Sequence, residues 1–372
     1  MAGIYIHIPF CKSKCAYCNF FSVVSEKQRV DFLEALKREA MARKDYLGGE
    51  EIRTIYFGGG TPSLLEPSEI DKILGVLSKY YTIIENPEIT LEANPDTVSK
   101  ESLLEYNKLG INRLSIGMQS FFDDDLQYLS RKHDSRHAMQ VLEWAKEVGF
   151  QEVTLDLIYG IPPLTDEKWR KNLEVFFSTG FNHLSAYALT VEEKTALGQR
   201  INKGVAAPVD EDAMLRQYDI LVEMTENQGF EHYEISNFAR PGHYSKHNTI
   251  YWKGEKYLGL GPSAHSFDGV SRQWNVASVK DYCESYSYER EELTLDDRYN
   301  EYVMTSLRTC WGCDVEYIRR NFGEKYAKKF EKGVKKYIST GQMFQKDQNF
   351  ILTDSGMLFA DGIAAELFII LF

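Results

Sequence analysis

Three cysteines stand close together near the start of the chain, at Cys11, Cys15 and Cys18, in the spacing C-x3-C-x2-C. Thiolates are soft ligands that suit iron–sulfur clusters or zinc. A structural zinc site needs a fourth ligand, and the nearby His7 lies inside a predicted strand, where side chains alternate in direction. A [4Fe–4S] cluster usually takes four cysteines, so three of them would leave one iron open for a bound molecule. Three reduced thiols packed in a core are the plain alternative.

A second pair, Cys310 and Cys313, has the C-x2-C spacing of thioredoxin-like redox pairs. This pair follows a predicted helix, whereas such redox pairs normally lie between a strand and a helix. The other C-x2-C of the chain, Cys15 and Cys18, belongs to the early motif, so none is left to complete a zinc site with this pair. We therefore expect incidental thiols here, and we expect Cys283, on a predicted helix, to be a core residue.

Residues 247–252 read H-N-T-I-Y-W, in a segment rich in histidine, glycine and aromatic residues. Read alone, a single histidine such as His247 is more often a hydrogen-bonded structural residue.

The composition is that of an ordinary globular protein, because 43% of the 372 residues are apolar and 26% are charged. This balance excludes wholesale disorder, and the length predicts two or three domains. The formal charge of −12 argues against a chain built to hold nucleic-acid phosphates. Six cysteines are too few for a disulfide scaffold, and no segment resembles a secretory signal or a membrane-spanning helix. We therefore expect a cytoplasmic protein.

Strand and helix patterns alternate along the first part of the chain. Four times a helical stretch ends at a glycine and a β-rich run follows, and glycine is favoured just past a helix because it adopts positive φ without steric cost. These glycines are Gly110, Gly149, Gly180 and Gly229. The predicted strands are 4–8, 54–57, 88–93, 113–118, 152–158, 183–189 and 232–235. The predicted helices start near Ser25, Pro67, Ser99 and Ser135.

This alternation predicts an α/β fold with right-handed crossovers and a parallel sheet of six or seven units. The periodicity leaves open whether the sheet is doubly wound or forms a full or partial barrel. Both arrangements place functional residues at the carboxyl ends of the strands. The cysteine motif comes directly after the first strand, so it would lie at that edge.

The pattern changes near Leu293, and we expect one domain over residues 1–290 and a second over residues 291–372. Helical patterns over 295–308, 315–321 and 325–339, a short strand pair and a last helix from Ser355 give an α+β outline similar to a winged helix. The third of these helices carries lysines on one face and apolar residues on the other. The apolar face should pack on the domain core. The basic face should be solvated, or it should contact an anionic membrane surface or an acidic partner. The lysines are Lys325, Lys328, Lys329, Lys332, Lys335 and Lys336.

The cysteine motif at the end of a first strand resembles the signature of radical S-adenosylmethionine enzymes. The local sequence YIHIPFCKSKCAYCNF is similar to the branch that contains oxygen-independent coproporphyrinogen III oxidase and a heme chaperone group. The similarity continues through GGGTPS at 58–63, EANPD at 92–96, SIGMQSF at 115–121 and DLIYGIP at 156–162. It implies a partial (β/α)6 barrel, open on one side, with a small C-terminal domain.

The resemblance also implies contacts to S-adenosylmethionine at the strand ends. A glycine run lets a ligand approach the backbone closely, and the segment with Gly59, Gly60 and Thr61 resembles the one that contacts the methionyl amino group. Read alone, such a run is more often a turn. Arg131 would bind the carboxylate, because a guanidinium forms bidentate bonds. The other implied contacts are Glu92, Gln119 and Asp156 toward the ribose and methionyl parts, and Tyr5, Tyr17 and Ala188.

Three features favour the heme chaperone group over the oxidase. The oxidase pattern continues to a fourth motif cysteine, whereas Phe20 stands at that position in this chain. The motif begins almost at Met1, without the N-terminal extension that the oxidase carries. Residues 247–252 match the H-N-x-x-Y-W motif associated with heme binding in the chaperone group.

The residue types of this motif suit the heme role that the resemblance implies. Imidazole is a common axial ligand of heme iron, which makes His247 a candidate ligand. Tyr251 and Trp252 could place flat apolar rings with polar edges against a porphyrin. Further candidates in this segment are Asn248 as a contact and His243 and His265 as alternative iron ligands.

The resemblance thus implies three bound groups: a [4Fe–4S] cluster, S-adenosylmethionine and heme. An electron entering the cluster would pass to the sulfonium and give methionine and a 5′-deoxyadenosyl radical, so an electron donor is an expected partner. A recipient hemoprotein is expected, a homodimer and membrane contact stay open, and a nucleic-acid partner is not expected. The alternative is the oxidase, which abstracts hydrogen from substrate propionates before carbon dioxide is lost.

Overall fold

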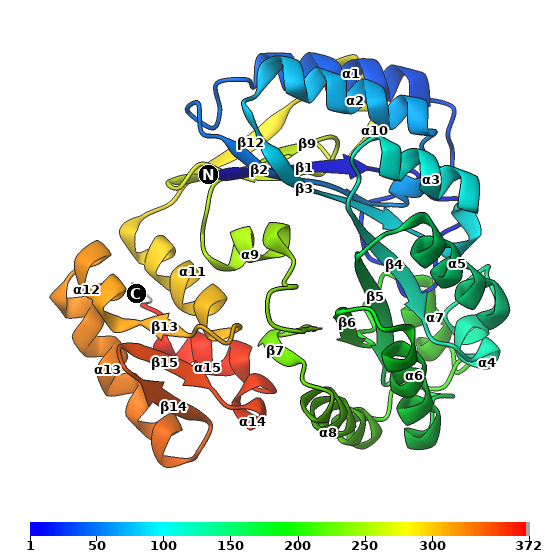
Figure 1. The fold of residues 1–372 in the computed structure, drawn as a ribbon. Helices are drawn as coiled ribbons and strands as arrows, with labels where there is room; N and C mark the ends of the chain where they lie inside the picture. Colours follow the sequence, from blue (N-terminus) through cyan, green and yellow to red (C-terminus); the bar gives the residue numbers. More distant parts are fainter. Residues whose placement is uncertain (370–372) are drawn as a thin grey trace.

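Six parallel strands form the centre of a twelve-stranded sheet with the order β12-β11-β10-β9-β1-β2-β3-β4-β5-β6-β8-β7. The structure is a computed structural model and describes residues 1–369. The parallel strands are β1 (Ala2–Ile8), β2 (Ile52–Gly59), β3 (Ile83–Ala93), β4 (Arg113–Gln119), β5 (Glu152–Tyr159) and β6 (His183–Ala188). The predicted α/β partial barrel is confirmed, because the sheet curves into an arc (Figure 1) and, within residues 1–369, its edge strands β12 and β7 do not pair with each other.

Helices cover the outer face of this arc (Figure 1). They are α1 (Arg29–Ala42), α2 (Pro67–Tyr80), α3 (Lys100–Lys108), α4 (Asp123–Tyr128), α5 (Ser135–Val148), α6 (Asp166–Thr179), α7 (Ala196–Asn202), α8 (Glu211–Asn227) and α10 (Val279–Glu284), with 3-10 turns η1 (Pro62–Leu64) and η2 (Pro95–Thr97). Strand β4 is buried at every position, as expected for a parallel strand covered on both faces. The main hydrophobic core therefore lies between the sheet and these helices.

The glycine signal is confirmed at all four positions. Gly110, Gly149, Gly180 and Gly229 have φ angles of 92°, 99°, 73° and 74°. Ser99 caps α3 as expected, since its hydroxyl accepts a hydrogen bond from Ser102 N. The first helix begins at Arg29 and not near Ser25, because Lys27 N donates to the Ser25 hydroxyl in a turn before the helix.

Both ends of the sheet differ from the expected parallel pattern. The predicted strand 232–235 corresponds to β7 (Glu231–Glu234), but β8 (Asn237–Ala239) inserts between it and β6 and pairs antiparallel with both. The connection between β7 and β8 is too short for a parallel crossover, so they form a hairpin. At the other end, sequence periodicity did not identify four strands. Strand β9 (Tyr257–Leu260) pairs parallel with β1, and β10 (His265–Phe267), β11 (Ser271–Asn275) and β12 (Tyr288–Glu292) follow it in antiparallel pairs.

The C-terminal elements pack around a second hydrophobic cluster of their own. They are α11 (Leu295–Leu307), β13 (Cys313–Asp314), α12 (Val315–Asn321), α13 (Glu324–Ser339), β14 (Met343–Lys346), β15 (Asn349–Leu352), α14 (Asp354–Met357) and α15 (Ala360–Leu367). The six lysines of α13 are exposed, while Phe330 and Val334 on its other side are buried in this cluster. Lys328 pairs with Glu324 and Lys336 with Glu366, which reduces the net charge of the basic face.

Candidate functional site

A cavity of about 460 Å³ opens at the carboxyl ends of the parallel strands. All three motif cysteines line it, together with nearly every residue that the family resemblance pointed to. The lining residues from that set are Cys11, Cys15, Tyr17, Cys18, Gly59, Gly60, Thr61, Glu92, Gln119, Arg131, Asp156 and Ala188. Tyr5 is the member outside the lining, since its ring lies deeper in the barrel and stacks on Tyr56 at 6.0 Å between centroids.

Backbone bonds hold the cysteine loop beside the sheet. Cys11 N donates to Val23 O at 2.9 Å, and Val23 N donates to Pro9 O at 2.7 Å, so the two ends of the loop are tied together. Within residues 1–369, no three of the His, Cys, Asp and Glu side chains converge on a single ion position. A zinc site requires such convergence, whereas the thiolates of a cluster bind separate irons. The donor chemistry and the open cavity therefore fit a cluster better than a zinc ion.

Two polar groups point at cluster-motif sulfurs. Thr61 Oγ1 donates to Cys11 Sγ at 3.6 Å, and Arg131 Nη1 donates to Cys15 Sγ at 3.5 Å. Hydrogen bonds to sulfur stabilise a thiolate and adjust the potential of a bound cluster. Both donors come from the ends of other elements, so the sheet brings them to the loop.

Arg131 is aimed into the cavity by the end of α4. Arg131 N donates to Leu126 O at 2.9 Å and Ser130 N donates to Gln127 O at 3.0 Å, which is the Schellman pattern of a helix C-terminus. The turn requires a left-handed residue, and here this residue is Ser130, with φ 61°, in place of the usual glycine. Non-glycine residues in this region carry strain that surrounding contacts must offset.

Glu92 links the end of β3 to the glycine run. Its carboxylate accepts hydrogen bonds from the Tyr56 hydroxyl at 2.8 Å and from Gly59 N at 3.1 Å. Burial raises the pKa of Glu92 to about 7, with a further contribution from the charge of Asp156. Gly59 has φ 109°, and a Cβ there would come within 2.7 Å of the His7 ring, so a side chain is excluded. This arrangement leaves backbone exposed to the cavity.

Gln119 reaches the cavity because the end of β4 is irregular. The pairing of β4 with β5 shifts register between Gly117 and Gln119, and Gln119 has φ 66°. Opposite this bulge, Asp156 accepts hydrogen bonds from Ser115 Oγ at 3.2 Å. Burial raises the pKa of Asp156 to about 6. Bulges commonly re-aim a side chain beside a functional site.

Sequence reasoning missed Asn94, which connects several members of the site. Asn94 Nδ2 donates to Thr61 Oγ1 at 3.1 Å, and its Oδ1 accepts from Arg131 Nη2 at 2.9 Å. It stands just after β3, so the strand-end rule offered a signal for it. Ser115 and Tyr187 also line the cavity, and Tyr187 is 45% exposed. Both residues lie within strands, and the sequence did not predict which face of the sheet their side chains occupy.

The H-N-T-I-Y-W segment forms a short helix, α9 (Lys246–Trp252), on the inner side of the arc (Figure 1). His247 is fully buried, its Nδ1 lies 2.8 Å from Thr54 Oγ1, and its Nε2 lies 2.9 Å from the Tyr251 hydroxyl. Its ring also stacks on Tyr56 at 4.9 Å between centroids. Burial lowers the pKa of His247 to about 3, with a smaller effect of the Arg53 charge. In this conformation both ring nitrogens lie within hydrogen-bond distance of a hydroxyl group, and direct ligation of iron by His247 stays a prediction.

The other members of this segment are distributed differently. Tyr251 and Trp252, at the C-terminal end of α9, are half-buried, as is Asn248. His243 Nδ1 lies 2.8 Å from Glu152 Oε1. His265, on β10, is the more accessible alternative ligand, because its side chain is exposed. His247 and Tyr251 are one turn apart and share a face of α9, where the Tyr251 hydroxyl reaches the His247 ring.

The late cysteines show no sign of redox activation. Burial raises the pKa of Cys310 to about 11 and raises the pKa of Cys313 further. Reactive thiols of C-x2-C motifs instead have lowered pKa values. Cys313 lies in the core of the C-terminal cluster, and Cys283 packs against the main core, both in agreement with the expected structural roles.

Comparison with known proteins places the chain among characterised relatives. The Radical SAM superfamily matches residues 5–176, and the HemN C-terminal domain matches residues 293–359. The heme chaperone HemW of Bacillus subtilis is 32% identical over 371 residues, covering 98% of each chain. HemW of Mycobacterium tuberculosis is also 32% identical, over 98% of this chain and 94% of that one.

The chain is also similar to a mitochondrial protein and to a solved structure. The mitochondrial radical S-adenosyl methionine domain-containing protein 1 of zebrafish is 35% identical over 71% of this chain and 60% of its own length. The solved coproporphyrinogen III oxidase HemN from Escherichia coli superposes with a TM-score of 0.85, over 98% of this chain and 89% of that chain, at 23% identity. The latter likeness establishes the fold. None of the described helices is both long and apolar enough to cross a membrane.

Proposed function

Because the chain belongs to the radical SAM family of HemW heme chaperones, we propose that it binds a [4Fe–4S] cluster, S-adenosylmethionine and heme, and delivers heme to a hemoprotein. The observation that carries this proposal is the shared cavity, where three thiols, Arg131, Glu92 and Asp156 meet at the carboxyl ends of parallel strands. Two observations together support the proposal: this set of donor groups, and the similarity of nearly the whole chain to relatives named heme chaperones.

The three motif thiolates would hold three irons of the cluster and leave the fourth for the cofactor. When bound, the cluster supplies an electron that can cleave the sulfonium of S-adenosylmethionine. Arg131, anchored by Asn94, would bind the methionyl carboxylate by its remaining donors, and Glu92 and Asp156 would accept hydrogen bonds from amino or hydroxyl groups. The exposed glycine run would lie along the ligand, since no side chain can occupy Gly59.

The heme would bind through the C-terminal end of α9, where Tyr251 and Trp252 are half-buried at the molecular surface. Their rings provide flat apolar area for a porphyrin face. His247 would act as a positioning residue, because its Nε2 is 2.9 Å from the Tyr251 hydroxyl and fixes that ring. Direct iron ligation by His247 would first require this hydrogen bond to break.

Anaerobic reconstitution with iron and sulfide, followed by an absorption spectrum with and without added hemin, tests the proposal on one sample. We expect a cluster spectrum, a separate heme spectrum, and transfer of the heme to apomyoglobin. The absence of hemin binding by the reconstituted protein would refute the chaperone function.

Coproporphyrinogen III oxidase is the second candidate, and the strength of the structural similarity to HemN is the reason to test it. The same preparation is incubated with coproporphyrinogen III, S-adenosylmethionine and a reductant. We expect no protoporphyrinogen, because Phe20 stands where the oxidase motif has its fourth cysteine. Sustained conversion would instead assign the chain to the oxidase.

A further inference from the structure

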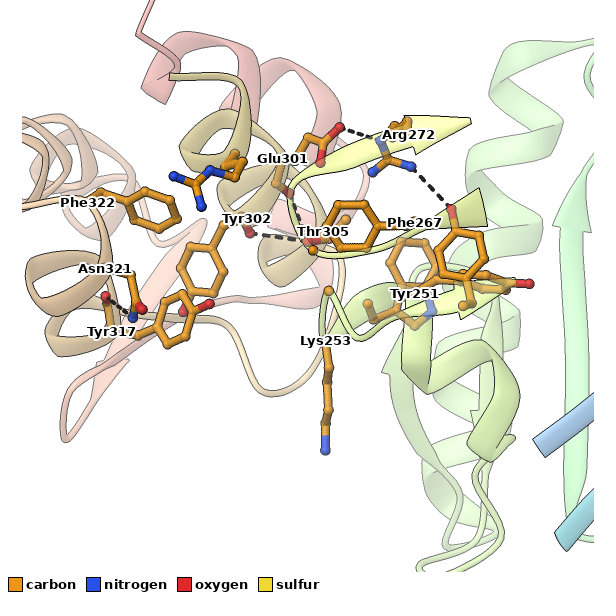
Figure 2. Close-up of a pocket in the computed structure, with 15 residues that line it drawn as sticks. Tyr251, Lys253, Phe267, Arg272, Glu301, Tyr302, Thr305, Tyr317, Asn321 and Phe322 are labelled. Atoms are coloured by element: carbon orange, nitrogen blue, oxygen red, sulfur yellow. Dashed lines mark hydrogen bonds and ion pairs between the residues drawn. The ribbon is translucent and has the colours of Figure 1, made fainter. Parts of the chain in front are cut away.

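A second cavity, of about 350 Å³, lies between the barrel extension and the C-terminal domain, and it shares no lining residue with the cysteine cavity. Figure 2 shows Tyr302, Tyr317 and Phe322 of the C-terminal domain on one side and Tyr251 and Phe267 on the other. This volume falls in the range of small-molecule sites, about 300–1,000 Å³, and such sites favour domain interfaces. The chemistry of the cysteine site assigns no role to this second cavity.

The two sides of this cavity are built from flat aromatic rings. On the C-terminal side, Tyr302 and Tyr317 stack at 4.5 Å between centroids with an interplanar angle of 23°. On the barrel side, Tyr251 packs edge-on against Tyr257 at 4.7 Å, and Tyr257 lies 6.2 Å from Phe267. Facing aromatic walls select a planar, largely apolar ligand, because ring faces and edges pack closely against another flat ring system.

Two buried donors that belong to residues lining the cavity lack an acceptor. Of its three lining cations, Arg272 is paired with Glu301 at 2.6 Å, and the Lys253 ammonium lies over the Trp311 ring at 4.7 Å. Arg298 Nε is buried without a hydrogen-bond partner in the described part of the chain, and so is Trp252 Nε1. Buried donors left unsatisfied are costly, and a guanidinium is best satisfied by a carboxylate. The missing component is therefore an anionic acceptor.

A planar aromatic ligand that carries carboxylates satisfies both requirements, and a porphyrin with propionate side chains has this chemistry. We infer that this interdomain cavity holds the carried heme, with the porphyrin between the aromatic walls and a propionate on Arg298. The inference rests on the proposed function and adds that the C-terminal domain forms half of the heme site. Tyrosine is the one common type of heme-iron ligand among the residues that line the cavity. Burial raises the pKa of Tyr251, Tyr257 and Tyr302, which disfavours a tyrosinate ligand, so the porphyrin and its carboxylates would supply most of the affinity.

Three ligands separate these contributions: hemin, iron-free protoporphyrin IX and hemin dimethyl ester. Each is titrated anaerobically into the reconstituted full chain while absorbance and tryptophan fluorescence are followed. For the unchanged protein we expect hemin and protoporphyrin IX to bind within about threefold of each other, and the ester to bind about tenfold more weakly, a difference of about 1.4 kcal/mol. Equal affinity for hemin and its ester would contradict a propionate contact.

The Arg298→Gln variant should weaken hemin binding about tenfold and abolish the preference over the ester, with Arg298→Lys restoring part of it. Arg320→Gln is the matched control, since Arg320 is exposed on α12 and does not line the cavity. Tyr317→Ala should weaken all three ligands alike, and unfolding midpoints show that each variant folds. Wild-type hemin affinity in Arg298→Gln would overturn this inference alone, whereas hemin binding absent from the unchanged protein would overturn the proposed function as well.

Discussion

Arg131 Nη1 donates a hydrogen bond to Cys15 Sγ at 3.5 Å, so the guanidinium that lines the cavity is tied to the cysteine motif. Its Nη2 donates to Gly117 O at 2.7 Å and to Asn94 Oδ1 at 2.9 Å. A Cβ on Gly117 would lie 3.3 Å from Arg131 Nη2, so a glycine keeps this space open. The side chain is therefore preorganised by three separate segments before any ligand arrives.

Replacing Arg131 should weaken S-adenosylmethionine binding. Arg131→Gln should lower the affinity about ten- to hundredfold, since a charge-assisted hydrogen bond contributes about 1.5–3 kcal/mol. Arg131→Lys should recover only part of it, because a lysine cannot reproduce the fork geometry. Equilibrium binding to anaerobically reconstituted protein measures the effect, with the exposed neighbour Lys132→Gln as the control. Unchanged affinity in Arg131→Gln would remove this residue from the site.

Each motif cysteine should be necessary for the cluster, whereas the late cysteines should not. Cys11→Ser, Cys15→Ser or Cys18→Ser should each abolish the visible absorbance and the bound iron and sulfide after reconstitution, because no spare cysteine lies in the cavity. Cys310→Ser is the control and should retain the full cluster. A cluster that survives in two of the three motif variants would show that other ligands hold it.

Glu92 should make stability depend on pH in the direction opposite to a salt-bridged acid. Burial raises the pKa of Glu92 from its ordinary value of 4.5 to about 7, so the folded state binds more protons than the unfolded state between these values. The free energy of unfolding should therefore fall as pH rises from about 4.5 to 7. The free energy of unfolding of Glu92→Gln, taken relative to that of wild type, should therefore be higher at pH 8 than at pH 5. Because the cavity admits water, we expect this difference to be only about 1–3 kcal/mol.

Urea unfolding of the cluster-free protein at both pH values measures this difference. Glu85→Gln is a matched control, because Glu85 lies on the same strand β3 and is exposed. We expect its effect to be the same at pH 5 and pH 8. A Glu92→Gln effect that also does not change with pH would show that Glu92 ionises normally.

Ser130 should be a site where glycine stabilises the protein. With φ 61°, Ser130 pays a steric cost of roughly 1–2 kcal/mol that glycine avoids, partly offset by the greater freedom of glycine in the unfolded chain. Ser130→Gly should therefore raise the free energy of unfolding by about 0.5–1 kcal/mol. Ser178→Gly, within helix α6, should lower it by about as much. A destabilising Ser130→Gly would mean that the serine side chain makes a necessary contact.

His247 should contribute to stability more than to heme affinity. His247→Ala removes one buried and one partly buried hydrogen bond and the stacking on Tyr56, and should lower the free energy of unfolding by about 2–4 kcal/mol. His265→Ala, at an exposed position, should change it by less than about 0.5 kcal/mol. Chemical unfolding and hemin titration are done on the same samples. Loss of hemin binding at normal stability would return His247 to the role of iron ligand.

The sequence by itself determined the features that depend on local spacing. The C-x3-C-x2-C motif after a strand, the alternation of helix and strand, and the glycines after helices are set by neighbours along the chain, and Gly149 and Gly180 indeed end α5 and α6. Strand-end positions such as Glu92 and Asp156 followed from the same periodicity. Their side chains share one cavity because parallel strands all end at the same edge.

Tertiary structure decided everything that depends on contacts between distant segments. The pairing of β8 with β6, the link from Asn94 to Thr61 and Arg131, and the burial of His247 against Thr54 and Tyr56 all join parts of the chain far apart in sequence. The sequence of a motif is the same whether the ring of its histidine faces a ligand or packs in the core. Only the packing of α9 against the barrel settled that orientation, because hydrogen-bond partners for a buried ring nitrogen come from whichever strands fold beside it.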